Sequence, residues 1–179
     1  MTQPKATLQE SIAQQRQALT GLLKKPLHDV AEACSRVWGD RQKLDEVLSR
    51  LLPSVPNCKF LYALDTKAIQ IRDNDTHSKL VEKDFGRDRS SRPYMSQAVP
   101  CTDFLLSESY ISLRARRPSL TAIQIVRDTA GTTLGFIGAD FDLRDLPLTR
   151  ELYEEPLHWR QIKGCLLYTS DAADDYLTV

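Results

Sequence analysis

Apolar residues recur with helical spacing over the N-terminal third of the chain, from Thr7 to Arg50. Intervals of three, four and seven residues place them on one side of a helix. The stripe consists of Leu8, Ile12, Leu19, Leu23, Leu27, Val30 and Val37. It predicts a helix that covers the core of the protein, and the alternative is a seam between the two copies of a homodimer.

The expected ends of this helical region follow from capping and helix-breaking residues. Residues 7–10 (TLQE) have the form of a capping box, and Pro26 marks the place of an expected kink. Gly39-Asp40 provides a break and a cap before a second helix, which Pro53 and Pro56 end. We therefore expect two consecutive helices before the rest of the fold.

From Cys58 onward the spacing of apolar residues changes to two, which is typical of β-strands. The segments with this spacing are 58–65, 68–72, 109–114, 120–128 and 133–143. Turn residues at 65–67 and 128–131 connect two hairpins, so we expect an antiparallel sheet. The polar segment between residues 72 and 109 is too long for a plain connector and predicts a binding loop. Helices followed by a five-stranded sheet give an α+β fold.

Composition narrows the class of protein. The 179 residues are 41% hydrophobic and 27% charged, which suffices for one core. Because 24 basic residues balance 24 acidic residues, no overall field attracts nucleic acid. The chain shows neither an apolar run of membrane-spanning length nor a signal peptide, which predicts a cytoplasmic location. Its four cysteines are too far apart for a zinc site or a disulfide scaffold, so we expect them to be reduced.

Motifs for catalysis or for cofactor binding are missing from the sequence. It contains no G-x-S-x-G, H-E-x-x-H, P-loop or G-x-G-x-x-G, and the three histidines stand alone. We therefore expect neither an enzyme nor a bound metal or cofactor.

Three segments, in this order, carry a resemblance to a known family: FLYALDTKAIQI, GRDRSSRPYM and FLLSESYISLRARRPSLTAIQIVRDTAGTTLGFIGADFDLRDLP. Residues 8–147 resemble a Cache domain, the PAS-like ligand sensor of bacterial chemoreceptors, histidine kinases and cyclases. The resemblance implies a PAS-like five-stranded antiparallel sheet with a long N-terminal helix on one face. On the other face a small ligand binds under the long loop. Known ligand classes in the family include carboxylates, amino acids, amines and purines.

Alternation along the segment LGFIGADFDL agrees with a binding site on one face of the sheet. One set of side chains is apolar and suits a core: Ile137, Ala139, Phe141 and Leu143. The other set combines an aromatic ring, a glycine and carboxylates: Phe136, Gly138, Asp140 and Asp142. The second set suits the wall of a binding site in which a ligand approaches the backbone at Gly138.

The resemblance also implies roles for single residues. In amino-acid-binding members, an arginine followed by aromatic residues holds the ligand carboxylate, and a tyrosine and two aspartates hold the ammonium group. The matching residues are Arg92, Tyr94, Tyr110 and Asp140. Ser112 stands in place of one aspartate and Met95 in place of a second aromatic residue, so carboxylate recognition is better preserved than amino-acid recognition. Because a guanidinium binds a carboxylate through two parallel hydrogen bonds, Arg92 is the expected main contact, and the Ser112 side chain is expected beside that of Tyr110.

Alternatives to these roles remain open. Arg87 and Arg89 alternate with acidic residues, so we expect them to form ion pairs on a solvated loop rather than to contact a ligand. For Arg92 and Asp140, a mutual salt bridge inside the fold is the alternative to ligand binding. The corresponding functions are a sensing module for a small carboxylate-containing ligand and a ligand-free structural or dimerisation domain with a degenerate Cache fold.

The expected organisation has four parts. Residues 1–57 form a helical segment that packs on the sheet, 58–147 the sensor core, and 148–164 a connector. Residues 165–179 (CLLYTSDAADDYLTV) resemble a translated sequencing-adapter read-through. We therefore expect an artefactual or disordered tail there, and a natural sequence that continues beyond Gly164 into an output domain.

Overall fold

The computed structural model describes residues 8–72, 84–98, 103–112 and 116–146. The chain divides into two units, Met1–Leu143 and Arg144–Val179. The helices and the sheet belong to the first unit, and the expected connector and tail lie outside the described residues. Within the described residues, no helix is long and apolar enough to cross a membrane.

Two consecutive helices form the N-terminal part, as the apolar spacing predicts. Helix α1 spans Leu8–Ser35, with Pro26 inside it, and α2 spans Arg41–Leu51. The carboxylate of Asp40 caps α2 by accepting a hydrogen bond from the backbone N–H of Lys43 at 3.2 Å. A 3₁₀ turn, η1, follows at Leu52–Ser54 and ends the helical region.

The middle of the helical stripe belongs to the core. Leu19, Leu23, Leu27 and Val30 are all at most 2% exposed within the single chain. Leu19 and Leu23 are therefore core residues, in line with the first of the two alternatives for the stripe. The side chains of Leu8 and Ile12 lie outside the description.

The sheet is antiparallel and five-stranded, which confirms the α+β prediction. Its strands are β1 (Phe60–Asp65), β2 (Phe104–Leu106), β3 (Tyr110–Ile111), β4 (Pro118–Arg127) and β5 (Thr133–Asp142). The order is β1-β5-β4-β2, and β3 also pairs with β4. A second 3₁₀ turn, η2, follows β5 at Leu143–Asp145. The register places Tyr62 opposite Gly138 and Thr121 opposite Asp140, so β1 and β4 flank the middle of β5.

One strand of the sheet differs from the expected set. Segment 68–72 is not a regular strand, because it makes only two isolated bridges, Leu64 with Gln70 and Ile69 with Asp88, and no continuous ladder. Ala68 also has a positive φ of 64°, which interrupts an extended strand. The fifth strand is instead β2, whose three residues are too few to show a period of two.

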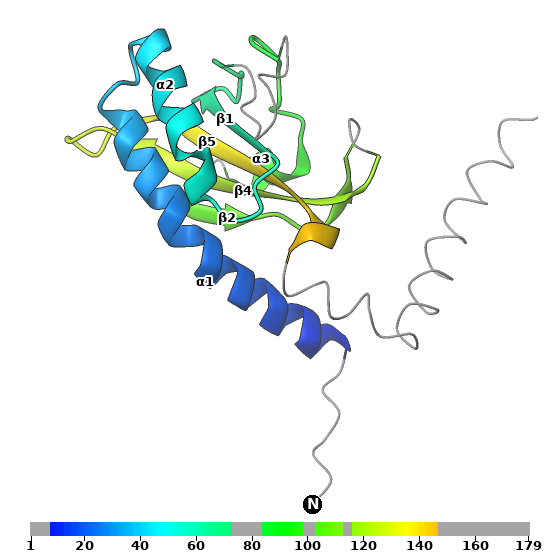
Figure 1. Cartoon of the computed structure of the whole chain (residues 1–179). Helices are drawn as coiled ribbons and strands as arrows, with labels where there is room; N and C mark the ends of the chain where they lie inside the picture. Colours follow the sequence, from blue (N-terminus) through cyan, green and yellow to red (C-terminus); the bar gives the residue numbers. More distant parts are fainter. Residues whose placement is uncertain (1–7, 73–83, 99–102, 113–115, 147–179) are drawn as a thin grey trace, which may run out of the picture. The chain divides into compact units, whose positions relative to one another are not determined.

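The two faces of the sheet carry different helices. Figure 1 shows α1 running along the sheet. Helix α1 packs along β4 and β5. A Cβ added at Gly135 would lie 2.6 Å from a ring carbon of Trp38, just after α1, so the face of residues 135, 137 and 139 is the α1 face. Helix α3 (Pro93–Ala98) packs with β2 and β4, and its Tyr94 and Met95 meet the opposite set of strand residues. We call this the α3 face.

Candidate functional site

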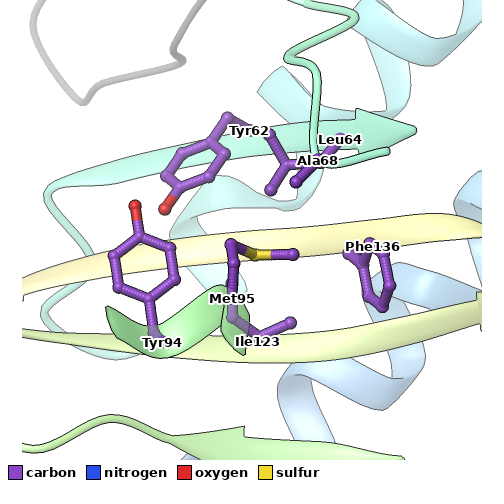
Figure 2. Packing of buried hydrophobic residues seen from close by; sticks show 7 residues of the cluster. All are labelled: Tyr62, Leu64, Ala68, Tyr94, Met95, Ile123 and Phe136. Carbon is purple, nitrogen blue, oxygen red and sulfur yellow. The ribbon is translucent and has the colours of Figure 1, made fainter. Parts of the chain in front are cut away.

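Side chains from three strands, α3 and the turn after β1 form a buried cluster on the α3 face (Figure 2). Its members are Tyr62, Leu64, Ala68, Tyr94, Met95, Ile123 and Phe136. Met95 is 1% exposed and lies between Tyr94 and Phe136, so α3 itself fills the apolar part of this face. The hydroxyl groups of Tyr62 and Tyr94 point toward one another at the polar end of the cluster.

Gly138 makes room for the ring of Tyr62. A Cβ added at Gly138 would lie 2.2 Å from Cε2 of that ring, much closer than any real contact. The absence of a side chain therefore lets the tyrosine ring approach the backbone of β5 closely. Gly138 does have the close approach that its sequence context predicts, but the group that approaches is a side chain of the protein.

Asp140 is the centre of the polar end. Its Oδ1 atom accepts hydrogen bonds from the Tyr62 hydroxyl at 2.9 Å and from the Thr121 hydroxyl at 2.7 Å. Since Thr121 donates its proton to Asp140, the Tyr110 hydroxyl, 2.6 Å from Thr121 Oγ1, must donate to Thr121. The hydroxyl groups of Tyr110 and Thr121 thus form an ordered hydrogen-bond chain that ends at the carboxylate, and the Tyr62 hydroxyl donates to the same oxygen separately.

Arg89 lies beside Asp140 on the α3 face. Its Nη1 atom lies 4.0 Å from Oδ2 of Asp140, and its guanidinium carbon lies 4.1 Å from the centre of the Tyr62 ring. Its Nε donates to Gln70 Oε1 at 2.8 Å, and Nη1 approaches the Tyr94 hydroxyl at 3.4 Å. Hydrogen bonds and a cation–π contact therefore hold the guanidinium in one place.

Burial shifts the protonation of this cluster. Burial raises the pKa of Asp140, although Arg89 and the hydroxyls of Thr121 and Tyr62 favour the ionised form. Burial also raises the pKa of Tyr62 and Tyr110, with a contribution from the neighbouring carboxylate. For Arg89, burial lowers the pKa, but interactions with Tyr62 and Asp140 outweigh it and the pKa is raised. The arginine stays charged, and Asp140 holds its proton more tightly than an exposed aspartate does.

Three of the predicted site residues come together in the structure. Tyr94 and Tyr110 have ring centroids 6.0 Å apart, and Tyr110 reaches Asp140 through Thr121. Arg92 is half-buried at the start of α3, and its charge favours the ionised form of Asp140. Ser112 follows β3, where its backbone bonds with Arg117 and Arg116; the hydrogen bonds that join Tyr110, Thr121 and Asp140 do not include it.

The prediction for Arg89 is wrong. We expected it to form ion pairs on a solvated loop, but it is only 6% exposed, because Tyr62, Gln70 and Tyr94 surround its guanidinium. Arg87 does behave as expected: its Nη1 lies 3.2 Å from Oδ1 of Asp84. Two arginines separated by one residue thus have opposite environments.

The sequence did not identify Tyr62, Thr121 and Gln70 as neighbours of Asp140 and Arg89. For two of them the sequence does contain a pattern that could have done so. Tyr62 and Thr121 lie on strands with clear alternation, so a correct pairing of those strands with β5 would have placed both beside Asp140. Gln70 had no such signal, since its segment lacks a regular ladder. Among the described residues, no group of three or more His, Cys, Asp or Glu side chains is placed to hold a metal ion.

In sequence, neither a protein-family profile nor a curated protein matches the chain. Solved structures do match it in fold. An extracellular ligand binding receptor from Desulfohalobium retbaense has a TM-score of 0.62 and 15% identity, over 83% of this chain and 27% of that one. The ligand-binding domain of the Campylobacter jejuni chemoreceptor Tlp3, in complex with 4-methylisoleucine, has a TM-score of 0.61 and 15% identity, over 83% and 58%.

A third match is the ligand-binding domain of the Pseudomonas fluorescens chemoreceptor CtaA in complex with L-isoleucine. Its TM-score is 0.56 at 17% identity, over 78% of this chain and 54% of that one. The Cache-like fold expected from the sequence is thereby confirmed. The chain spans less than two thirds of these structures. Because one of them is described as extracellular, the expected cytoplasmic location has no support from these matches.

Proposed function

We propose that this chain is a small-molecule-sensing module of bacterial signal transduction that binds a carboxylate-containing ligand on the α3 face. The fold is that of chemoreceptor ligand-binding domains whose structures contain amino acids. In this proposal Arg92 holds the ligand carboxylate, the rings of Tyr94 and Tyr110 flank the ligand, and Ser112 and Asp140 complete the site.

The spacing of the central charges carries the proposal. Arg89 is buried and Asp140 is mostly covered, with side chains 7% and 19% exposed, yet their nearest atoms are 4.0 Å apart. An ion pair that serves stability alone needs close, hydrogen-bonded contact to offset the cost of desolvation. A loosely paired carboxylate beside two arginines is better suited to a polar ligand.

A second candidate function is a structural or dimerisation domain that binds no ligand. It is favoured by the internal partners of Asp140, since Tyr62, Thr121 and Arg89 already surround the carboxylate. A thermal-shift screen against carboxylates, amino acids, amines and purines separates the two functions. A ligand that binds the folded state raises the melting temperature, whereas no shift with any class would favour the structural domain.

Calorimetry on single variants tests the role of Arg92. We expect Arg92→Lys to weaken binding of a carboxylate found in the screen at least tenfold, because an ammonium group cannot form the paired contact of a guanidinium. Arg87→Lys is the matched control and should change the affinity less than twofold, since Arg87 pairs with Asp84. Equal losses at both positions would contradict a specific role of Arg92 and indicate a diffuse basic patch.

A further inference from the structure

We infer that Arg89 occupies the place of a ligand's cationic group, so that the site selects carboxylates without an ammonium group. This inference rests on the proposed function and names its ligand class. It depends on three features of the α3 face: the fixed position of Arg89, the partners of Asp140, and the balance of charge around them.

The guanidinium of Arg89 cannot swing aside without losing several contacts at once. Gln70, which accepts from its Nε at 2.8 Å, is itself 0% exposed and donates to the backbone oxygen of Arg72 at 2.6 Å. The Tyr62 ring covers one face of the guanidinium, and Tyr94 lies near Nη1. A cation is thus built into the site before any ligand arrives.

The carboxylate of Asp140 can meet a second cation at close range chiefly through the oxygen that already faces Arg89. Its Oδ1 already accepts from Tyr62 and Thr121, and its Oδ2 is the oxygen that faces Arg89. An ammonium group that approached Oδ2 would meet the guanidinium at similar distance, and like charges repel strongly where water is excluded.

The balance of charge around Asp140 also favours an anion. Arg89 and Arg92 both act on this one carboxylate. Asp142, the next acidic residue on the same face, has its own partner in Arg117, whose Nη1 lies 3.6 Å from Oδ2 of Asp142. Two cations and one carboxylate leave a net positive site, which a ligand with a single negative charge neutralises.

Matched ligand pairs that differ only by the amino group test the inference on the full chain. Suitable pairs are acetate and glycine, propanoate and L-alanine, and 3-methylbutanoate and L-valine, each measured by calorimetry. We expect the amine-free acid to bind at least tenfold more tightly in every pair that binds. In Arg89→Gln, which removes the charge, this preference should fall at least tenfold.

Arg89→Lys is the control that separates charge from packing. It keeps the cation but loses the planar fork, so it should keep the preference even where overall affinity falls. Tighter binding of the amino acid by the natural sequence would overturn the inference and leave the proposed function standing. If Arg89→Gln does not fold, the test still rests on the natural sequence and Arg89→Lys. Both should bind the amine-free acid more tightly than the matching amino acid. An absence of binding for every acid and amino acid would overturn both the inference and the proposed function.

Discussion

The two faces of the sheet differ in what they bury: the α1 face buries apolar side chains, and the α3 face also buries charged and polar groups. The α1 face is apolar throughout its middle: β5 contributes Ile137, Ala139 and Phe141, all at most 1% exposed, beneath the leucines of α1. The α3 face carries the carboxylate of Asp140, the guanidinium of Arg89 and several phenolic hydroxyls. They lie beside the apolar cluster that Figure 2 shows. A stable core needs only complementary shape and apolar surface, whereas a polar buried cluster needs each group to have its own partner.

The largest expected effect is on the α1 face. Leu27→Ala should lower the free energy of unfolding by about 2–5 kcal/mol, because it leaves a cavity under a helix. Leu27 is 0% exposed, whereas Leu22 on the same helix is 37% exposed. Leu22→Ala is therefore the matched control and should cost less than about 0.5 kcal/mol in urea unfolding. Equal losses would mean that α1 packs differently on the sheet.

Gly138→Ala should have the next largest effect, because the new methyl group displaces the Tyr62 ring from β5. We expect a loss of about 1–3 kcal/mol, the usual cost of overpacking a buried position. Gly21→Ala is the control: nothing lies within 4 Å of its added Cβ, and it should stabilise α1 by about 0.5–1 kcal/mol. An unchanged unfolding midpoint for Gly138→Ala would contradict the close packing of Tyr62.

Removing one hydroxyl from the polar chain should have a smaller effect. Thr121→Val keeps the shape of the side chain but ends the hydrogen bond to Asp140 and the link to Tyr110. We expect the free energy of unfolding to fall by about 0.5–1.5 kcal/mol. In the Asp140→Asn background, Thr121→Val should lower the free energy of unfolding by measurably less. If the two losses are strictly additive in this double-mutant cycle, the hydroxyl chain and the carboxylate are not a coupled unit.

The smallest expected effect is a change in how stability depends on pH. The pKa of Asp140 is raised in the folded state above its ordinary value of 3.8. The protonated form is thus favoured by folding, and its contribution is complete below pH 3.8 and lost as pH rises through the folded-state pKa. Relative to Asp140→Asn, the natural sequence should therefore lose stability as pH rises from about 4.

Asp88 provides a control of opposite sign. Hydrogen bonds from Ser90 lower the pKa of Asp88 in the folded state. The natural sequence should therefore be more stable than Asp88→Asn above the ordinary aspartate pKa. This difference in stability should disappear as pH falls through the lowered pKa of Asp88. Urea unfolding from pH 3 to pH 8 measures both differences. The same trend for both aspartates would contradict the buried environment of Asp140.

Local patterns of the sequence determined α1, α2, the hairpin of β4 and β5, and the α1 face. Helical spacing identified Leu19, Leu23 and Leu27 as one side of α1, and alternation sorted the side chains of β5 correctly between the two faces. These features depend on neighbours within a few residues, where the periods of 3.6 and 2 act directly. The cap at Asp40 has the same local origin.

Only the tertiary structure decided the partners on the α3 face. The hydroxyl of Tyr62 bonds with a carboxylate 78 residues away, and Arg89 bonds with an amide 19 residues away. Asp84 and Asp88 precede Arg89 in the sequence, and such acidic neighbours are typical of a solvated arginine. In the structure, however, the Tyr62 ring and the buried amide of Gln70 surround its guanidinium. The sequence shows which residues are charged but not which of them pair. The energy of a charge pair depends on the distance and on the local dielectric constant, and both are set by the packing of segments far apart in the chain.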